Sequence, residues 1–205
     1  MPTRASTLVI GALSAVMMSY TALALIPGFQ LSTVEATPER IEYTAAQARG
    51  RLVYQREGCL YCHTQQVRAE GFGVDQARGW GSRGSLPGDY VYDDPPLLGS
   101  MRTGQDLHDI GHRVPSLEWH LTHLYQPRAL VAGSLMPAYP YLFEVRDPAD
   151  VLPSEVTVAL PRQYQPGDGK VVVATRDALD LVAYLQSLRV SPVLQADGGT
   201  APTVN

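Results

Sequence analysis

The sequence has 205 residues, a formal net charge of −4 and a pI near 5.7. Its length is large for one minimal domain and small for two full ones. The acidic balance excludes nucleic acid as a partner. Apolar residues make up 45% of the chain, as in ordinary globular proteins, while 18 glycines and 16 prolines predict many loops.

The N-terminus contains a long uncharged stretch, with no charged residue between Arg4 and Glu35. A helix of about 20 apolar residues rises about 30 Å, the thickness of a bilayer's hydrocarbon core. We therefore predict a cytoplasmic segment over residues 1–6 and a transmembrane anchor over residues 7–27. Two alternatives remain: a cleaved secretory signal, since an Ala-Leu-Ala sequence resembles its cleavage site, and a buried core helix, which must be apolar on every face.

Orientation follows from Arg4 and the terminal amine, because positive charge favours the cytoplasmic side of a membrane. The rest of the chain is then expected outside the cytoplasm. Pro27-Gly28 is expected to end the span, and residues 28–42 to form a linker.

Apolar periodicity predicts three helices in the remaining chain. Residues 44–57 carry one broad apolar stripe, residues 117–125 form a short helix between Ser116 and Pro127, and residues 177–188 place apolar side chains at intervals of three and four. The glycine-rich residues 71–99 are predicted to be loop. Two extended segments, residues 156–160 and 170–175, are expected to form a short two-stranded element.

The sequence Cys59-Leu60-Tyr61-Cys62-His63 contains both cysteines of the chain. Cys-x-x-Cys-His spacing is typical of covalent heme c attachment, in which each thiol bonds a heme vinyl group and the histidine ligates iron. A redox thiol pair does not need the histidine, and a zinc site requires a second pair of ligands; both remain alternatives. We predict one heme c, bonded to Cys59 and Cys62 and ligated by His63.

A second axial ligand must come from elsewhere in the chain. His/Met ligation fills the iron's coordination sphere and suits electron transfer. Met101 and Met136 are the methionines that follow the anchor, and Met136-Pro137 lies between two predicted helices, as in the ligand loop of small cytochromes c. We predict Met136 as the ligand; Met101, or a core-filling role for Met136, are the alternatives.

Four further histidines form two closely spaced pairs. His120 and His123 are three positions apart, and His108 and His112 are four apart, so each pair could share a helical face and a metal ion. Isolated pairs are more often structural. No histidine is arranged with a Ser or Cys nucleophile, so no hydrolase or transferase is indicated.

Several sequence strings, taken together, are more specific than the heme motif. They are residues 43–51 (YTAAQARGR), 56–68 (REGCLYCHTQQVR), 92–95 (YDDP), 99–107 (GSMRTGQDL), 118–120 (EWH), 123–125 (HLY) and 136–140 (MPAYP). This set resembles the monoheme cytochrome c subunit (subunit II) of cbb3-type cytochrome c oxidases.

The resemblance implies a mainly α fold, with one N-terminal transmembrane helix, a cytochrome c-like domain with long loops over residues 43–190, and a flexible tail over residues 191–205. In cytochromes c the helix before the heme motif crosses the C-terminal helix at a small residue. Residues Gly50, Tyr54, Leu181 and Tyr184 match that crossing, although two amphipathic helices with unrelated partners are the alternative.

The resemblance also implies a function and a location. Such a subunit takes electrons from another cytochrome c subunit or a soluble cytochrome c. It passes them to heme b of the heme-copper catalytic subunit, which reduces oxygen and pumps protons, so the chain itself has no catalytic site. It would sit among the lipids of the bacterial cytoplasmic membrane as a single-pass protein, with its N-terminus cytoplasmic and its heme domain periplasmic.

Further site residues follow from the matched positions. Arg68 and Arg102 are expected to pair with heme propionates, because a guanidinium matches a carboxylate; a surface or interface salt bridge is the alternative. A calcium ion at the subunit interface would lie near Ser100. The chain departs from the family pattern at Gln105, which replaces a proline, and at Leu98 and Met101. Gln105 still offers the backbone carbonyl that orients the proximal histidine.

Two other functions remain as alternatives. One is the small cytochrome c subunit of a bacterial nitric oxide reductase, which has the same plan of anchor and heme domain. The other, of a different class, is a membrane-tethered heme sensor or free-standing electron carrier, whose sensor form would keep an open sixth coordination position.

Overall fold

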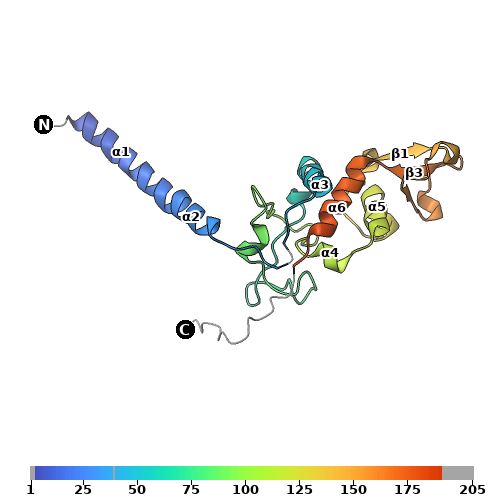
Figure 1. Cartoon of the computed structure of the whole chain (residues 1–205), viewed down its shortest axis with the longest axis horizontal. Helices are drawn as coiled ribbons and strands as arrows, with labels where there is room; N and C mark the ends of the chain where they lie inside the picture. The colour runs from blue at the N-terminus through green and yellow to red at the C-terminus, as the bar shows by residue number, and fades with distance from the viewer. Residues whose placement is uncertain (1–2, 39, 191–205) are drawn as a thin grey trace.

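The computed structural model describes residues 3–38 and 40–190, and the predicted C-terminal tail lies outside them. The described chain is mainly helical, as predicted. A long N-terminal helix extends away from the rest of the chain, where shorter helices and a small sheet pack together (Figure 1).

The long helix consists of α1 (Arg4–Tyr20), a π-helical turn (Thr21–Leu25) and α2 (Ile26–Ser32). Thr3 caps it by accepting a hydrogen bond from the Ser6 N–H. The whole helix is 29 residues long, and its most apolar window has a mean hydropathy of 2.0 with none of its residues buried. By length and composition it is able to cross a membrane.

We had expected the helix to end at Pro27, but it continues to Ser32. The π-helical turn supplies the physical reason. The Ile26 N–H bonds to the Thr21 carbonyl, five residues back, so α2 starts a new register with Pro27 in its first turn. A proline there has no N–H that the helix needs.

Helices α3 (Ala45–Arg56) and α6 (Arg176–Ser187) cross at the centre of the remaining chain. Thr44 and Gln47 form a capping box at the start of α3, and Thr175 caps α6. The crossing is predicted correctly. A Cβ atom on Gly50 would lie 1.8 Å from the Asp180 carbonyl oxygen, so the two backbones touch where only glycine fits. Beside it, the Tyr54 and Tyr184 rings pack edge to face with centroids 5.5 Å apart.

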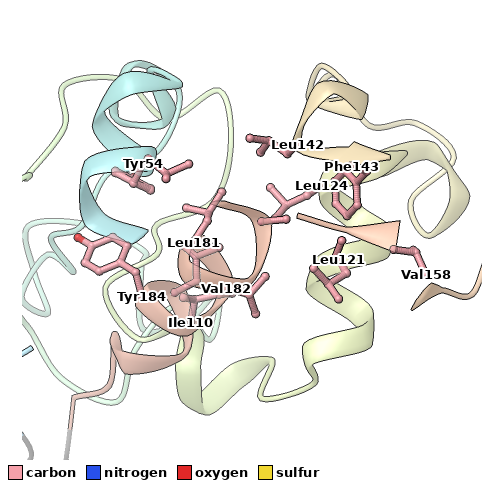
Figure 2. Close-up of a cluster of buried hydrophobic side chains, with 14 of the residues drawn as sticks. Tyr54, Ile110, Leu121, Leu124, Leu142, Phe143, Val158, Leu181, Val182 and Tyr184 are labelled. Atoms are coloured by element: carbon pink, nitrogen blue, oxygen red, sulfur yellow. The ribbon is translucent and has the colours of Figure 1, made fainter. Parts of the chain in front are cut away.

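The short helices α4 (Ile110–Arg113) and α5 (Leu117–Tyr125) pack against α6. Ser116 accepts a hydrogen bond from the Trp119 N–H and starts α5, as predicted. Figure 2 shows Leu121 and Leu124 of α5 beside Leu181 and Val182 of α6, within one buried apolar cluster that also takes in the sheet.

The sheet has three antiparallel strands in the order β1-β3-β2. They are β1 (Phe143–Arg146), β2 (Thr157–Val158) and β3 (Val171–Ala174). The two predicted segments correspond to β2 and β3, while β1 was not predicted. Phe143 of β1 pairs with Ala174, and both side chains are buried, so the third strand completes the apolar face.

The remaining segments are mostly loop, with short 3-10 turns. Residues 71–99 are loop apart from one such turn, as predicted. The 3-10 turns are Cys59–Tyr61, Pro87–Tyr90, Pro127–Ala129, Pro140–Leu142, Pro148–Asp150 and Arg162–Tyr164.

Candidate functional site

The Cys-x-x-Cys-His motif forms a tight turn directly after α3. Gly58 adopts a left-handed conformation with φ of 71°, which suits glycine, and a 3-10 turn begins at Cys59. The N–H groups of Cys62 and His63 both donate to the Cys59 carbonyl, at 3.1 and 2.9 Å. Both cysteines are free thiols; Cys59 is partly buried and Cys62 is exposed. Burial raises the pKa of the Cys59 thiol to about 12.

The His63 ring is oriented by a backbone carbonyl. Its Nδ1 atom lies 2.7 Å from the Gln105 carbonyl oxygen, and because a carbonyl can only accept, Nδ1 carries the hydrogen. Nε2 is then the atom with a free lone pair. Burial lowers the pKa of His63, which favours the neutral imidazole that metals bind.

A glycine-containing loop packs against the same histidine. A Cβ atom on Gly104 would lie 2.2 Å from His63 Cε1, and one on Gly99 would lie 2.3 Å from the His63 carbonyl oxygen. The Gly104 N–H also donates to the Cys62 carbonyl at 2.9 Å. The motif and the loop therefore form one unit, in which small residues let the backbone approach the imidazole.

Met136 lies in a loop, half-buried against the apolar cluster that Cys59 also contacts. The chain that follows it is tied to the motif. The Tyr141 hydroxyl donates to Glu57 Oε2 at 2.7 Å, two residues before Cys59. Burial raises the pKa of Tyr139 to about 12, and Cys59 and Cys62 act in the same direction, so this phenol lies near both thiols.

These residues fit a heme c. The chain presents two unpaired thiols at the required spacing, a neutral imidazole with its Nε2 lone pair free, and a thioether that packs against the same apolar cluster as Cys59. Imidazole and thioether are an established axial pair for heme iron in cytochromes c. An apolar cluster on one side provides the low-polarity surroundings that a porphyrin needs.

Sequence reasoning missed two aromatic residues at this site, Trp119 and His123 of α5. Their rings stack with centroids 4.6 Å apart and an interplanar angle of 15°. Burial lowers the pKa of His123 to about 4, with His120 and His63 acting in the same direction, so His123 lies near His63. The sequence strings EWH and HLY contain these residues, but they indicated only family membership and a possible metal site shared by His120 and His123.

Arg102 has protein partners at all three guanidinium nitrogens. Nη1 bonds to Asp75 at 2.6 Å, Nη2 to the Gln66 carbonyl at 2.6 Å, and Nε to Thr64 at 3.0 Å. This arrangement favours the salt-bridge interpretation of Arg102. Within the described part of the chain, the exposed Arg68 side chain forms no salt bridge, although its backbone N–H donates to Asp75.

The other histidines have separate partners. His108 Nε2 lies 3.2 Å from Asp89, His112 Nδ1 lies 2.7 Å from Asp109, and His120 Nε2 donates to the Val114 carbonyl at 2.8 Å. Among residues 3–38 and 40–190, no group of three or more His, Cys, Asp or Glu side chains gathers to hold a metal ion. Ser100 is exposed in the loop after Gly99.

Comparison with protein families identifies a matching family model. The model described as "Cytochrome C oxidase, mono-heme subunit/FixO" matches residues 1–165, which include the N-terminal helix, the Cys-x-x-Cys-His motif and Met136. No curated protein matches the chain.

Proposed function

The chain belongs to the cytochrome c oxidase mono-heme subunit (FixO) family, and from that membership we propose that it relays electrons, through one covalent heme c, to the catalytic subunit of a cbb3-type oxidase. One observation carries this proposal. His63 donates its Nδ1–H to the Gln105 carbonyl and leaves Nε2 free, beside two unpaired thiols at heme-binding spacing.

We assign the residues the following roles. Cys59 and Cys62 would hold the heme through thioether bonds, and His63 and Met136 would supply the protein ligands to its iron. A heme bound there supplies a one-electron couple of ferric and ferrous iron. With His63 and Met136 both committed as ligands, the chain would relay electrons without making or breaking substrate bonds. Electrons then leave through contact with the catalytic subunit, where oxygen is reduced.

Two peripheral assignments accompany this core. Arg68, whose guanidinium has no salt bridge among the described residues, is our candidate partner for a heme propionate. We propose that Arg102 instead holds the loop beside His63 through Asp75. Calcium near Ser100 rests on the resemblance alone.

We propose that the N-terminal helix is retained as a membrane anchor, with the N-terminus cytoplasmic and the heme domain periplasmic. The helix has the length and apolarity to span a bilayer, and Arg4 lies at its N-terminal end. The intact mass of the mature protein distinguishes an anchor from a cleaved signal. A mature chain that begins near Pro27 would rule the anchor out.

The ligand assignment is tested by Met136→Ala. Loss of the thioether opens the sixth position, so the ferrous protein should bind carbon monoxide and its reduction potential should fall. Absorbance spectra with and without carbon monoxide measure the first effect, and Met101→Ala is the matched control. A Met136→Ala protein with the wild-type spectrum would move the ligand elsewhere.

The function is tested by purifying the chain with its partners in detergent and measuring turnover. We expect a heme-copper catalytic subunit to co-purify and oxygen to be consumed with reduced cytochrome c as donor. Turnover of nitric oxide without oxygen consumption would indicate the nitric oxide reductase alternative. Carbon monoxide binding by the wild-type heme in this chain would indicate a sensor.

A further inference from the structure

We propose that the side chain of Gln105 is a positioning group for His63, and that its hydrogen bond to Arg113 holds the carbonyl that orients the imidazole. This inference rests on the proposed function, because it concerns the strength of an iron ligand. It goes beyond that function by assigning two residues, Gln105 and Arg113, that contribute no ligand of their own.

The contacts form a continuous chain. Arg113 Nη1 donates to Gln105 Oε1 at 2.8 Å, and Arg113 Nη2 donates to the Asp106 carbonyl. Between these two contacts lies the Gln105 carbonyl, which accepts from His63 Nδ1 at 2.7 Å. The Arg113 guanidinium therefore bonds to both residue 105 and residue 106, on either side of the Gln105 carbonyl that accepts from His63.

Arg113 is itself held in a fixed position. It lies in α4, where the Gly111 N–H donates to the Leu188 carbonyl at 2.9 Å. A Cβ atom on Gly111 would lie 2.3 Å from the Gln186 carbonyl oxygen, so α4 packs directly on the end of α6. The Arg113 guanidinium thus attaches the loop to α4, which is itself fixed on the central helix pair.

The loop needs this support because Gln105 has little of its own. Its side chain is exposed and it lies in neither a helix nor a strand. Among the described residues its N–H has no hydrogen-bond partner. A proline at this position would fix φ through its ring and would lose no N–H contact. The bond from Arg113 to the glutamine side chain provides a restraint that a ring would otherwise provide.

The restraint should affect iron through His63. A hydrogen bond from Nδ1–H to a carbonyl raises the basicity of the imidazole and favours ferric over ferrous iron. A more mobile carbonyl weakens that bond, so the reduction potential should rise. Because the bond from Arg113 lies at the surface, we expect a change of only about threefold in the ferric-to-ferrous preference, or ~28 mV at 59 mV per tenfold.

The test compares Gln105→Met, Gln105→Pro and the wild-type protein, each loaded with heme and in detergent. Methionine keeps the length of the side chain but removes the acceptor for Arg113; proline removes the side chain but fixes φ. We expect Gln105→Met to raise the reduction potential, which corresponds to about a threefold change in the ferric-to-ferrous preference. It should also shift the ferric electron paramagnetic resonance spectrum, which reports the orientation of the axial ligands. Gln105→Pro should resemble the wild type in both.

Each other outcome is informative. Identical potentials and spectra for Gln105→Met and wild type would overturn the inference, as would equal shifts in the methionine and proline variants. If Gln105→Met loads no heme, Arg113→Lys, which keeps the charge but not the two-pronged grip, must show the same rise or the inference fails. A wild-type protein without covalent heme would instead overturn the proposed function.

Discussion

At the scale of single residues, His63 is held by backbone rather than by other side chains. The Gln105 carbonyl accepts from its Nδ1, and Gly104 lies against the ring itself. The orientation of the imidazole therefore depends on the backbone of residues 104 and 105, which the hydrogen bond from Arg113 to Gln105 helps to hold. The requirement at position 104 is therefore the absence of a side chain.

We expect Gly104→Ala to abolish or strongly reduce heme loading. The new Cβ would lie 2.2 Å from His63 Cε1 and 2.7 Å from Nδ1, so the ring must rotate and lose its bond to Gln105. Heme per protein, measured as the absorbance of the pyridine adduct, checks this. Thr103→Ala, which truncates an exposed neighbour, is the control and should load normally. Normal loading of Gly104→Ala with unchanged spectra would contradict the prediction.

Asp89 is a buried carboxylate that links several loops. It accepts from Arg83 at 2.6 and 2.8 Å and from Thr37 at 2.8 Å, and His108 lies 3.2 Å away. Burial alone would raise its pKa, but the hydrogen bonds from Arg83, His108, the Leu86 N–H and Thr37 together hold the pKa well below its usual range.

The depressed pKa of Asp89 makes stability depend on pH. Its contribution to the free energy of unfolding is fully present above the unfolded pKa of about 3.9 and is lost as pH falls toward the folded pKa. Asp89→Asn should cost about 3–5 kcal/mol at pH 7, because the substitution removes the buried negative charge that accepts both hydrogen bonds from Arg83. The variant should also lose part of the wild-type decline in stability below about pH 5.

Denaturant unfolding between pH 3 and pH 7 measures both effects for Asp89→Asn. Asp168→Asn is the control, since Asp168 is exposed and its φ of 62° suits asparagine equally well. Parallel pH profiles for Asp89→Asn and wild type would show that this carboxylate is not linked to folding.

The residue scale also shows what sequence alone can suggest. The roles of Cys59, Cys62 and His63 stay predictions, and the sequence suggests them because their spacing is local. The partners of Arg102 were not predicted, because Asp75 is 27 positions away and the loop between them has no periodic pattern. Similarly, the stacking of His123 on Trp119 follows from helical spacing, but its approach to His63 depends on how α5 packs.

At the scale of elements, the crossing of α3 and α6 supports the site, since α3 leads directly into the Cys-x-x-Cys-His turn. Gly50 sets the distance between the two helices. Its N- and C-terminal neighbours in the chain carry long polar side chains, so the contact depends on this one small residue. Arg49 strengthens the crossing by pairing with Asp180 at 2.6 Å.

We predict that Gly50→Ala destabilises the protein, although alanine favours helix by about 1 kcal/mol. The new Cβ would meet the Asp180 carbonyl oxygen at 1.8 Å, and a backbone atom cannot rotate away as a side chain can. Separation of the helices should cost more than the propensity gain, with overpacking typically costing about 1–3 kcal/mol. Thermal unfolding measures the effect.

The matched control for Gly50→Ala is Gly167→Ala, because a Cβ atom on Gly167 meets nothing within 4 Å. It should change stability by less than about 0.5 kcal/mol. Unchanged stability of Gly50→Ala would mean that the helices can separate at no cost.

The elements also differ in how well sequence predicts them. The caps and apolar stripes of α3, α5 and α6 are local, and their bounds fall within a residue or two of expectation. Strand β1 was missed because its four residues are held in extended conformation by pairing with β3, which lies far along the chain. The predicted end of the N-terminal helix at Pro27 was wrong, because a π-helical turn lets the helix continue through that proline.

At the scale of the whole molecule, the segment after the N-terminal helix is fixed against the rest of the described chain. Figure 1 shows the long helix joining the domain at this segment. The Thr37 N–H donates to the Gly88 carbonyl at 3.1 Å, and Arg40 Nε donates to the Asp89 carbonyl at 2.5 Å. Arg40 also pairs with the buried Asp93 at 3.2 Å. These contacts of Thr37 and Arg40 form a clamp between the segment that follows the N-terminal helix and residues 88–93.

For the proposed electron relay this clamp matters, because electron transfer between two bound groups weakens steeply as their separation grows. A subunit anchored beside its partner by a loose tether would sample many separations. In this chain Arg40 is only 7% exposed and contacts Asp89 and Asp93, so we expect it to fix the segment after the N-terminal helix relative to the proposed heme domain.

We predict that Arg40→Ala loosens this connection without changing the heme. Asp93 keeps Arg51 at 3.2 Å, so the domain should stay folded, while the segment around position 40 becomes more sensitive to limited proteolysis. In the purified complex, oxygen consumption should fall although the reduction potential of the heme is unchanged. Glu42→Gln, an exposed substitution in the same segment, should match the wild type in all three measurements. Wild-type proteolysis and turnover in Arg40→Ala would show that the anchor's attachment does not depend on this residue.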